Sequence, residues 1–234
     1  MNQPVDTGPP AATRFADLTP AAAAIWAKSA DQGGHGLLAH MLDVAAVAER
    51  LMARESAAML PWAAQAFGLA SQDAQRALAA LAGLHDIGKA IAGFQAKWPA
   101  GKVADAAAGL TFSPALEVQD AHDRASAIEL ANLLAPYAGE VGRGGALAQA
   151  VAAHHGYVFL STELQNARRP GETLVWRNAR QELFDRYWST LRPVIIGSDA
   201  PSLTALCWLA GLTSVSDWIG SNIEWFAHGE RHET

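Results

Sequence analysis

The feature that most constrains the fold of this chain is its alanine content, because 51 of its 234 residues are alanine. Alanine has the highest helix propensity of the common residues and loses little side-chain entropy when it is buried. Half of the sequence is hydrophobic and 17% is charged, which predicts a buried core and excludes general disorder. The composition therefore favours helices that pack closely.

Apolar side chains recur at three- and four-residue steps in several segments, as they do on helices that face a core. These segments are 37–60, 74–85, 122–137, 145–155, 173–191 and 201–226. Gly156 follows the fourth segment in a position typical of a helix C-cap. The alternating segments 174–176 and 193–196 are too short to found a sheet. The predicted fold is all-α, a single compact helical domain.

The two ends of the chain differ from its middle. Residues 1–18 mix proline, glycine and small polar residues and are interpreted as a flexible N-terminal arm, 19–228 as the folded domain, and 229–234 as a polar tail. The sequence has no signal peptide pattern and no apolar run of roughly 18 residues, so we expect a cytoplasmic protein with no membrane partner. The single cysteine, Cys207, excludes a disulfide scaffold and is expected to be a small buried residue.

Several histidines and aspartates stand on otherwise apolar helix faces or directly beside them. Burying such groups without partners costs several kcal/mol, so they are expected to bind each other or a metal. Imidazole and carboxylate donors suit divalent Fe, Mn, Co or Ni, and a set this large suits two ions that share a carboxylate. Asp86 is the natural bridge, because it follows His85 directly. The predicted ligands are His40, His85, Asp86, His122, His154, His155 and Asp217.

Each of these residues alone also has a structural interpretation. A single histidine such as His40 is commonly a satisfied core residue, and Asp217 has serine hydroxyls nearby in the sequence. The number, the order and the placement of the set favour metal binding. The remaining histidines are expected on the surface, in a glycine-rich turn or in the tail: His35, His228 and His232.

The same segments resemble the HD-domain metal-dependent phosphohydrolases, through HDIGK at 85–89, the earlier His40 and the later Asp217. The resemblance is more specific to the HD nuclease domain of the CRISPR-associated helicase-nuclease of type I interference systems. It spans roughly residues 35–226, and the segments that carry it are LAHMLDV (38–44), LHDIGK (84–89), FQAKW (94–98), HDRASA (122–127), AHHG (153–156) and LAGLTSVSDWIGSN (209–222).

This resemblance implies a helical HD-domain fold with a two-metal site between its helices. It implies one ion held by His40, His85, Asp86 and Asp217, and a second held by Asp86, His122, His154 and His155. Asp86 and Lys89 are the implied catalytic residues, with Lys89 holding a phosphate or stabilising developing charge.

The implied activity is endonucleolytic cleavage of single-stranded DNA by two-metal activation of water. The implied partners are single-stranded DNA, an RNA-guided CRISPR surveillance complex that opens a duplex, and a helicase domain or subunit. No helicase sequence is present, so we expect either a separate nuclease subunit or an excised domain.

Residues 156–171 are predicted to form a long loop beside the metal site. Tyr157 and Phe159 are predicted to stack on bases, and Arg168 and Arg169 to contact phosphates. The alternative is an ordinary surface loop with two core aromatics. The net charge of −6 argues against broad electrostatic binding of nucleic acid and predicts weak, salt-sensitive DNA binding by this domain alone.

Two rival functions stay open. The first is another HD-type phosphohydrolase, acting on nucleotides or a cyclic dinucleotide, because HDIGK also occurs in cyclic-di-GMP phosphodiesterases. Their GYP signature is incomplete here, since Val158 stands where the proline would be. The second is a binding module with structural metals, and the complete ligand set argues against it.

Overall fold

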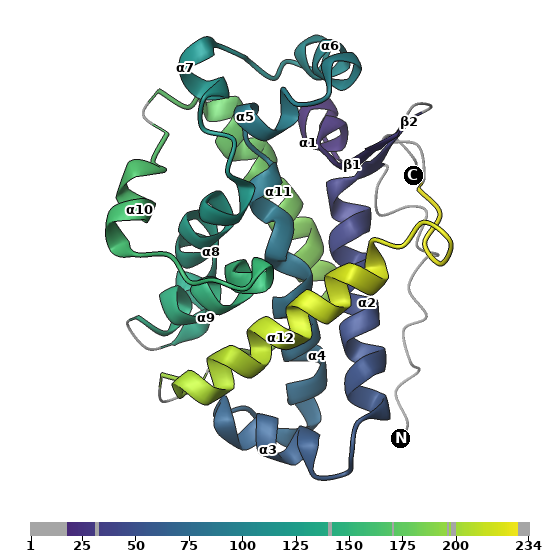
Figure 1. Ribbon diagram of the computed structural model, residues 1–234, viewed down its shortest axis with the longest axis vertical. Helices are drawn as coiled ribbons and strands as arrows, with labels where there is room; N and C mark the ends of the chain where they lie inside the picture. The colour runs from purple at the N-terminus through teal and green to yellow at the C-terminus, as the bar shows by residue number, and fades with distance from the viewer. Residues whose placement is uncertain are drawn as a thin grey trace, which may run out of the picture.

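The structure is a computed structural model that describes residues 18–30, 33–139, 142–169, 171–195, 197 and 200–228. Helices dominate it (Figure 1), which confirms the all-α prediction. Of the predicted arm and tail, all but Leu18 lies outside the described residues. The α-helices are α1 (Pro20–Ala24), α2 (Leu37–Arg54), α3 (Met59–Ala66), α4 (Ser71–Gly83), α5 (Ala92–Gln95), α6 (Pro99–Ala107), α7 (Pro114–Glu117), α8 (His122–Ala138), α9 (Arg143–Ala152), α10 (Ser161–Asn166), α11 (Leu174–Leu191) and α12 (Leu203–Gly220). The 3-10 helices are η2 (Leu84–Lys89) and η3 (Ala153–His155).

A short antiparallel hairpin, β1 (Trp26–Ala30) and β2 (Gly33–Gly36), precedes the first long helix. The sequence predicts no strand here, because β2 consists of three glycines and a histidine and has no apolar alternation. The hairpin is held from outside. The side-chain amide of Gln95 donates to the Trp26 carbonyl at 2.8 Å and accepts from the Trp26 N–H at 3.2 Å. The hairpin is therefore stabilised by contacts with another part of the chain, because its own residues have little strand propensity.

The long helices form two groups that meet at η2. Helix α2 lies beside α4, and η2 continues directly from the end of α4. Helices α8 and α9 pack against each other, and α8 also packs against η2. Helix α12 crosses α2, α4 and α9 on one side of the molecule (Figure 1). Segments that are far apart in the sequence meet at this junction, where the functional site is built.

Small residues let these helices approach closely. Ala77 and Ala80 of α4 are completely buried. Gly83 ends α4 at a point where a Cβ atom would overlap the Tyr187 hydroxyl and the Met41 carbonyl. The Tyr187 hydroxyl in turn donates a 2.7 Å hydrogen bond to the Ala80 carbonyl. The alanine-rich composition thus serves the close packing of α2, α4 and α11.

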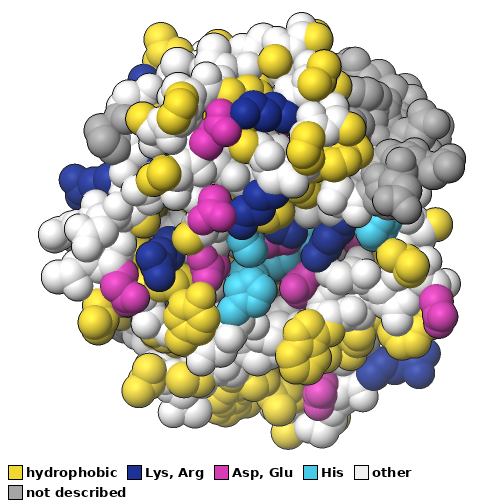
Figure 2. Space-filling view, turned by 45° about the horizontal axis from the view of Figure 1, so that its top comes forward, with side chains coloured by type: hydrophobic (Ala, Val, Ile, Leu, Met, Phe, Trp, Pro, Cys, Tyr) yellow, Lys and Arg dark blue, Asp and Glu magenta, His cyan; other side chains and the backbone are white. Residues whose placement is uncertain are grey.

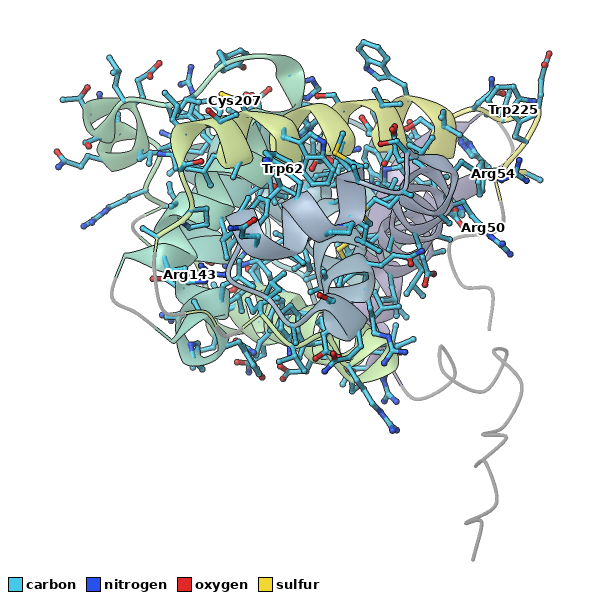
Figure 3. All side chains as sticks on the ribbon, turned by 90° about the horizontal axis from the view of Figure 1, so that it is seen from below. Arg50, Arg54, Trp62, Arg143, Cys207 and Trp225 are labelled. Carbon is cyan, nitrogen blue, oxygen red and sulfur yellow. The ribbon has the colours of Figure 1, made fainter. Side chains whose placement is uncertain are left out.

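Several sequence predictions need correction. The predicted helix 37–60 divides into α2 and α3, because Pro61 lacks an N–H and fits only the first turn of a new helix. The predicted helix 201–226 ends at Gly220, and the predicted loop 156–171 contains α10. Cys207, expected to be buried, is exposed on α12 (Figure 3). No helix in the described part of the chain is long and apolar enough to cross a membrane.

Candidate metal centre

The middle of the site is η2, whose six residues are all buried and include the HD pair. Helix α8 holds η2 in place through Ser126. Its hydroxyl donates to the His85 carbonyl at 2.6 Å and accepts from the Gly88 N–H at 2.9 Å. A Cβ atom at position 88 would overlap the His122 carbonyl, so glycine is what allows η2 and α8 to approach this closely.

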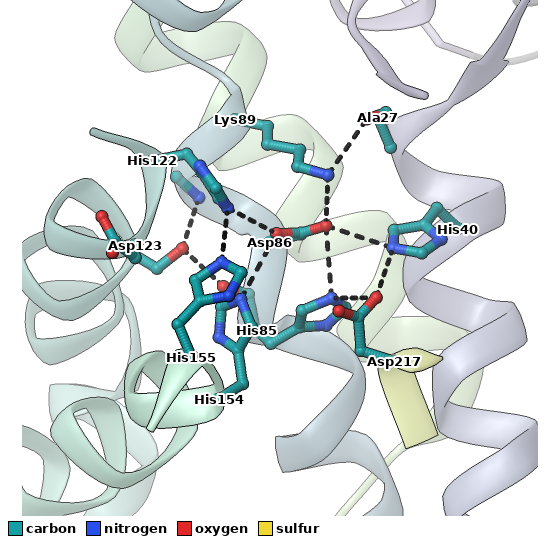
Figure 4. A network of polar contacts seen from close by, with 12 residues as sticks. Ala27, His40, His85, Asp86, Lys89, His122, Asp123, His154, His155 and Asp217 are labelled. Atoms are coloured by element: carbon teal, nitrogen blue, oxygen red, sulfur yellow. Dashed lines mark hydrogen bonds and ion pairs between the residues drawn. The ribbon is translucent and has the colours of Figure 1, made fainter. Parts of the chain in front are cut away.

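Four side chains from three elements form what we call the inner cluster: His40 of α2, His85 and Asp86 of η2, and Asp217 of α12 (Figure 4). The His40 Nε2 atom lies 3.1 Å from Asp86 Oδ2 and 3.5 Å from Asp217 Oδ1. The His85 Nε2 atom lies 3.2 and 3.3 Å from the same two oxygen atoms. Three of the four side chains are buried, and that of Asp217 is 13% exposed. The inner cluster therefore belongs to the core, and among its four members Asp217 is the most exposed.

Three histidines form what we call the outer cluster: His122 at the start of α8, and His154 and His155 of η3. The Nε2 atoms of His155 and His122 lie 3.4 Å apart. His154 is buried, with its Nδ1 atom 3.2 Å from the Val151 carbonyl, and this leaves its Nε2 atom for the cluster. His155 is exposed and His122 partly so. Gly156 caps η3 at a φ of 94°, as predicted.

Asp86 lies between the two clusters with one carboxylate oxygen toward each. Its Oδ2 atom belongs to the inner cluster, and its Oδ1 atom lies 3.4 Å from His122 Nε2 and 4.0 Å from His154 Nε2. A carboxylate shared by two ions has this arrangement, because each oxygen then has its own set of nitrogen neighbours. The fold brings all seven predicted ligands together, although they come from α2, η2, α8, η3 and α12.

The donor atoms fit a divalent ion better than they fit one another. Both ring nitrogens of His40 and His85, and Nε2 of His154, are buried without a well-formed hydrogen bond to the described residues. Carboxylate oxygens nevertheless lie 3.1–3.5 Å from the Nε2 atoms of the inner cluster. Donor atoms that share one ion at about 2.1 Å lie about 3.0–3.4 Å from each other. The spacing and the chemistry of these donors both suit divalent transition metals.

Burial and the two carboxylates set the charges of the site. Burial lowers the pKa of His122 to about 4 and that of His154 to about 3, so both rings are neutral at pH 7. Burial also disfavours the charged form of His85, but Asp86 and Asp217 outweigh it and raise the pKa of His85 to about 9. Although burial alone would raise them, the neighbouring histidines hold the pKa values of both carboxyl groups below their usual range. The inner cluster therefore attracts positive charge.

Lys89, predicted to meet a phosphate, has its ammonium group engaged elsewhere. The Nζ atom lies 2.6 Å from Asp86 Oδ2 and donates to the Ala27 carbonyl of β1 at 3.0 Å. It also lies 5.2 Å from the centroid of the Phe94 ring, within cation–π range. The side chain is only 6% exposed. In this structure Lys89 orients Asp86 and ties the hairpin to η2, and its predicted role toward a phosphate or developing charge stays a prediction.

The two aromatic residues predicted to bind DNA have different surroundings. Tyr157 is 50% exposed, and its hydroxyl donates to Asp123 Oδ2 at 2.6 Å. Phe159 is 4% exposed and packs against Ala127 and Ala152. The stacking role predicted for Phe159 is wrong, because its ring is buried in this small apolar cluster.

The two arginines predicted to bind phosphate also differ. Arg168 is exposed. Arg169 forms ion pairs with Glu129 and Glu172, and its side chain is 5% exposed. Arg180 joins the same two carboxylates. The phosphate contact predicted for Arg169 is wrong, because its charge is already neutralised within a network that joins α8 to α11.

Two residues at the edge of the inner cluster, Lys28 and His35, are not among the predicted site residues. The Lys28 Nζ atom lies 3.8 Å from Asp217 Oδ1, and its side chain is 26% exposed. His35, expected on the surface, is only 8% exposed. Its Nε2 atom lies 2.8 Å from Asp43 Oδ2, and its ring stacks on His228 at a centroid distance of 5.4 Å. No local signal could place either residue, because both lie on the hairpin that the sequence does not predict.

Histidine side chains gather at the centre of one face of the molecule, and Lys and Arg side chains lie beside them (Figure 2). The fold and this donor set define a helical protein with a histidine and aspartate centre suited to divalent metals. The family described as "Cas3, HD domain" matches residues 26–226. The chain therefore belongs to the Cas3 HD-domain family, which confirms the resemblance seen in the sequence.

Known relatives agree with this assignment. The "CRISPR-associated endonuclease/helicase Cas3" of Thermus thermophilus is 37% identical over 215 residues, which are 89% of this chain and 23% of that protein. The chain thus spans about a quarter of the length of this relative. The crystal structure of the Thermus thermophilus Cas3 HD domain in the presence of Ni2+ is 31% identical, with a TM-score of 0.68 over 91% of this chain and 82% of that one. A crystal structure of a CRISPR-associated protein is 33% identical, with a TM-score of 0.75 over 96% of this chain and 25% of that one.

Proposed function

We propose that this chain is a nuclease domain that binds two divalent transition-metal ions and cleaves single-stranded DNA endonucleolytically. One observation carries the proposal: the two carboxylate oxygens of Asp86 face two separate sets of histidine nitrogens. A site built to stabilise the fold needs one closed set of ligands, whereas this one has a buried set and a second set open to solvent. Membership of the Cas3 HD-domain family supports the nuclease activity.

In this proposal His40, His85, Asp86 and Asp217 would hold the inner ion, and Asp86, His122, His154 and His155 would hold the outer ion. Bound divalent ions supply Lewis-acid activation of water and neutralise charge on the phosphate. The protein contributes the geometry. Lys89 keeps Asp86 oriented, and the Ser126 hydroxyl fixes the backbone of η2 that carries it.

The surroundings of the site favour an anionic substrate. Lys28 stands at the open side of the inner cluster, 3.8 Å from Asp217. Lys97 is 46% exposed, pairs with Asp120 at 3.0 Å and lies over the Phe94 ring, whose centroid is 5.1 Å from that of His122. Both lysines have a carboxylate neighbour but keep part of their side chain exposed, so in this proposal they add positive potential beside the site although the overall charge is −6. Arg168 is exposed and remains a proposed phosphate contact, although it lies further along the sequence from the predicted metal ligands.

We further propose that the domain acts with a helicase and with an RNA-guided surveillance complex. The Thermus thermophilus relative is described as an endonuclease and helicase, and this chain matches about a quarter of it. A helicase supplies single strands, which a small acidic domain alone binds weakly. The site itself requires neither partner, so its chemistry can be tested in isolation.

The test is incubation of the purified chain with circular single-stranded DNA and Mn2+, Co2+, Ni2+ or Fe2+. We expect linear and shorter products with at least one ion, and none in excess EDTA. Asp86→Asn is the matched control, because it keeps the shape of the side chain and removes its charge. Absence of cleavage with every ion, or unchanged cleavage by Asp86→Asn, would overturn the proposal.

The rival phosphohydrolase is tested in parallel with nucleoside triphosphates and cyclic-di-GMP. Turnover of these without cleavage of DNA would favour the rival.

A further inference from the structure

The side chain of Tyr157 combines an exposed ring with a fixed hydroxyl at the edge of the outer cluster. Tyr157 follows His155 by two residues and is 50% exposed. Its hydroxyl donates a 2.6 Å hydrogen bond to Asp123, the residue directly after His122. The ring is thus tied to both segments that carry the open side of the metal centre.

Both carboxylate oxygens of Asp123 accept hydrogen bonds, and one of these bonds anchors Tyr157. It is 6% exposed, and while Oδ2 accepts the Tyr157 hydroxyl, Oδ1 accepts the Arg124 N–H at 2.8 Å. It belongs to neither donor cluster, although its neighbour His122 does. This buried carboxylate lies beside the candidate metal centre but points to a tyrosine, so metal binding does not explain its position.

A second contact fixes the orientation of the tyrosine ring. The centroid of the buried Phe159 ring lies 5.2 Å from that of Tyr157, at an interplanar angle of 86°. Edge-to-face pairs of this kind are favourable and directional. With the hydroxyl held by Asp123 and the ring supported by Phe159, Tyr157 presents the rest of its ring to solvent in a set orientation.

We infer that Tyr157 is a stacking platform for an unpaired base next to the phosphate that is cleaved, and that Asp123 is its positioning residue. The inference rests on the proposed nuclease function. Stacking of a base on an aromatic side chain contributes about 1–3 kcal/mol and tolerates any base. A base inside a duplex is already stacked and paired, so the platform favours single strands without reading their sequence.

The alternative is that Tyr157 only fastens residues 156–160 to α8. The two roles differ in what they affect. If Tyr157 stacks on a base, its substitution weakens only the binding of substrates that carry bases. If Tyr157 only attaches residues 156–160 to α8, its substitution disturbs the metal centre and slows the hydrolysis of every phosphodiester. Phosphodiesters with and without bases therefore separate the two roles.

The experiment measures KM and kcat with Mn2+ or Ni2+ for three substrates: a single-stranded oligothymidylate, the same strand with abasic positions, and bis(4-nitrophenyl) phosphate. For Tyr157→Ala we expect KM for the oligothymidylate to rise about 5- to 150-fold. Hydrolysis of the small diester is expected to stay within about twofold of wild type, and wild type and variant are expected to become alike on the abasic strand.

Further variants separate the ring from its anchor. Tyr157→Phe keeps the ring and is expected to raise KM less than Tyr157→Ala does. Asp123→Asn keeps one acceptor oxygen for the two donors that Asp123 accepts from, and it is expected to raise KM less than Asp123→Ala does. Val158→Ala, at a neighbouring exposed position, is the matched control and is expected to change neither constant. Metal content is measured for each variant.

The outcomes are distinguishable. If Tyr157→Ala loses the small diester and the oligothymidylate equally, or loses metal, Tyr157 is a fastening and the inference is wrong. If the variant keeps the wild-type KM for the oligothymidylate, the inference is also wrong, while the nuclease proposal stands. If the wild-type protein does not cleave the oligothymidylate, the proposed function itself fails, whether or not it hydrolyses the small diester.

Discussion

The inner and outer clusters differ in how the fold holds them, although both offer histidine nitrogens and share Asp86. Side chains of the inner cluster come from α2, η2 and α12, and three of the four are buried. The outer cluster lies at the start of α8 and on η3, and it grades from buried His154 to exposed His155. We therefore expect the buried inner cluster to contribute more to the stability of the fold and to metal retention. We expect the exposed outer cluster to give the substrate access to the site.

The largest expected effect comes from the residue that the clusters share. Asp86→Ala is expected to lower DNA cleavage at least about 1000-fold, equivalent to about 4 kcal/mol of transition-state stabilisation. It removes both carboxylate oxygens, one from each cluster. Metal content measured by mass spectrometry is expected to fall at both. Loss of only one ion per chain would show that Asp86 belongs to a single cluster.

Truncating one histidine in each cluster tests the difference in stability. His40→Ala empties a fully buried position and is expected to lower the free energy of unfolding by about 2–3 kcal/mol, even in EDTA. His155→Ala alters an exposed position and is expected to stay within about 0.5 kcal/mol. Urea unfolding followed by circular dichroism measures both. Equal losses would remove the distinction between a core-held and a surface cluster.

Metal binding is expected to stabilise the fold mainly through the inner cluster. An ion at 100 times its Kd that binds only the folded chain adds about 2.7 kcal/mol, or about 5–10 °C in Tm for a chain of this size. Thermal unfolding with and without Ni2+ measures the shift. Asp217→Asn is expected to lose most of it and His155→Ala to keep most of it. The reverse order would place the tighter site at the surface.

The smallest effects concern two serines that hold the clusters in place. Ser126→Ala removes hydrogen bonds to His85 and Gly88 in the core and is expected to cost about 1–2 kcal/mol. Ser214→Ala removes a 2.7 Å bond to the His154 carbonyl at a partly buried position and is expected to cost less than about 1 kcal/mol. Chemical unfolding of both variants compares them. A larger loss for Ser214→Ala would contradict the stronger burial of the inner cluster.

The inward or outward placement of residues on a single helix was predictable from the sequence. Contacts between residues of different elements were not. The inward placement of His40 and His85 follows from the apolar stripes of segments 37–60 and 74–85, although His85 lies on η2, just past the end of α4. The contact of Lys28 with Asp217 was not predictable, because it depends on a hairpin whose glycines carry no pattern. The burial of Phe159 was equally hidden, since it depends on α10 and α8 meeting.

The sequence by itself determined the helical class, the set of candidate metal donors and the family, because alanine content, apolar spacing and the HD pair are properties of the chain. Only the tertiary structure decided which oxygen of Asp86 faces which histidines, and that Lys89 forms an ion pair with Asp86. It also decided that the charge of Arg169 is neutralised by an ion pair, whereas the ring of Tyr157 stays exposed to solvent. Burial and charge pairing depend on which segments meet in space. A side chain's type states what it can do, and its neighbours decide which of those things it does.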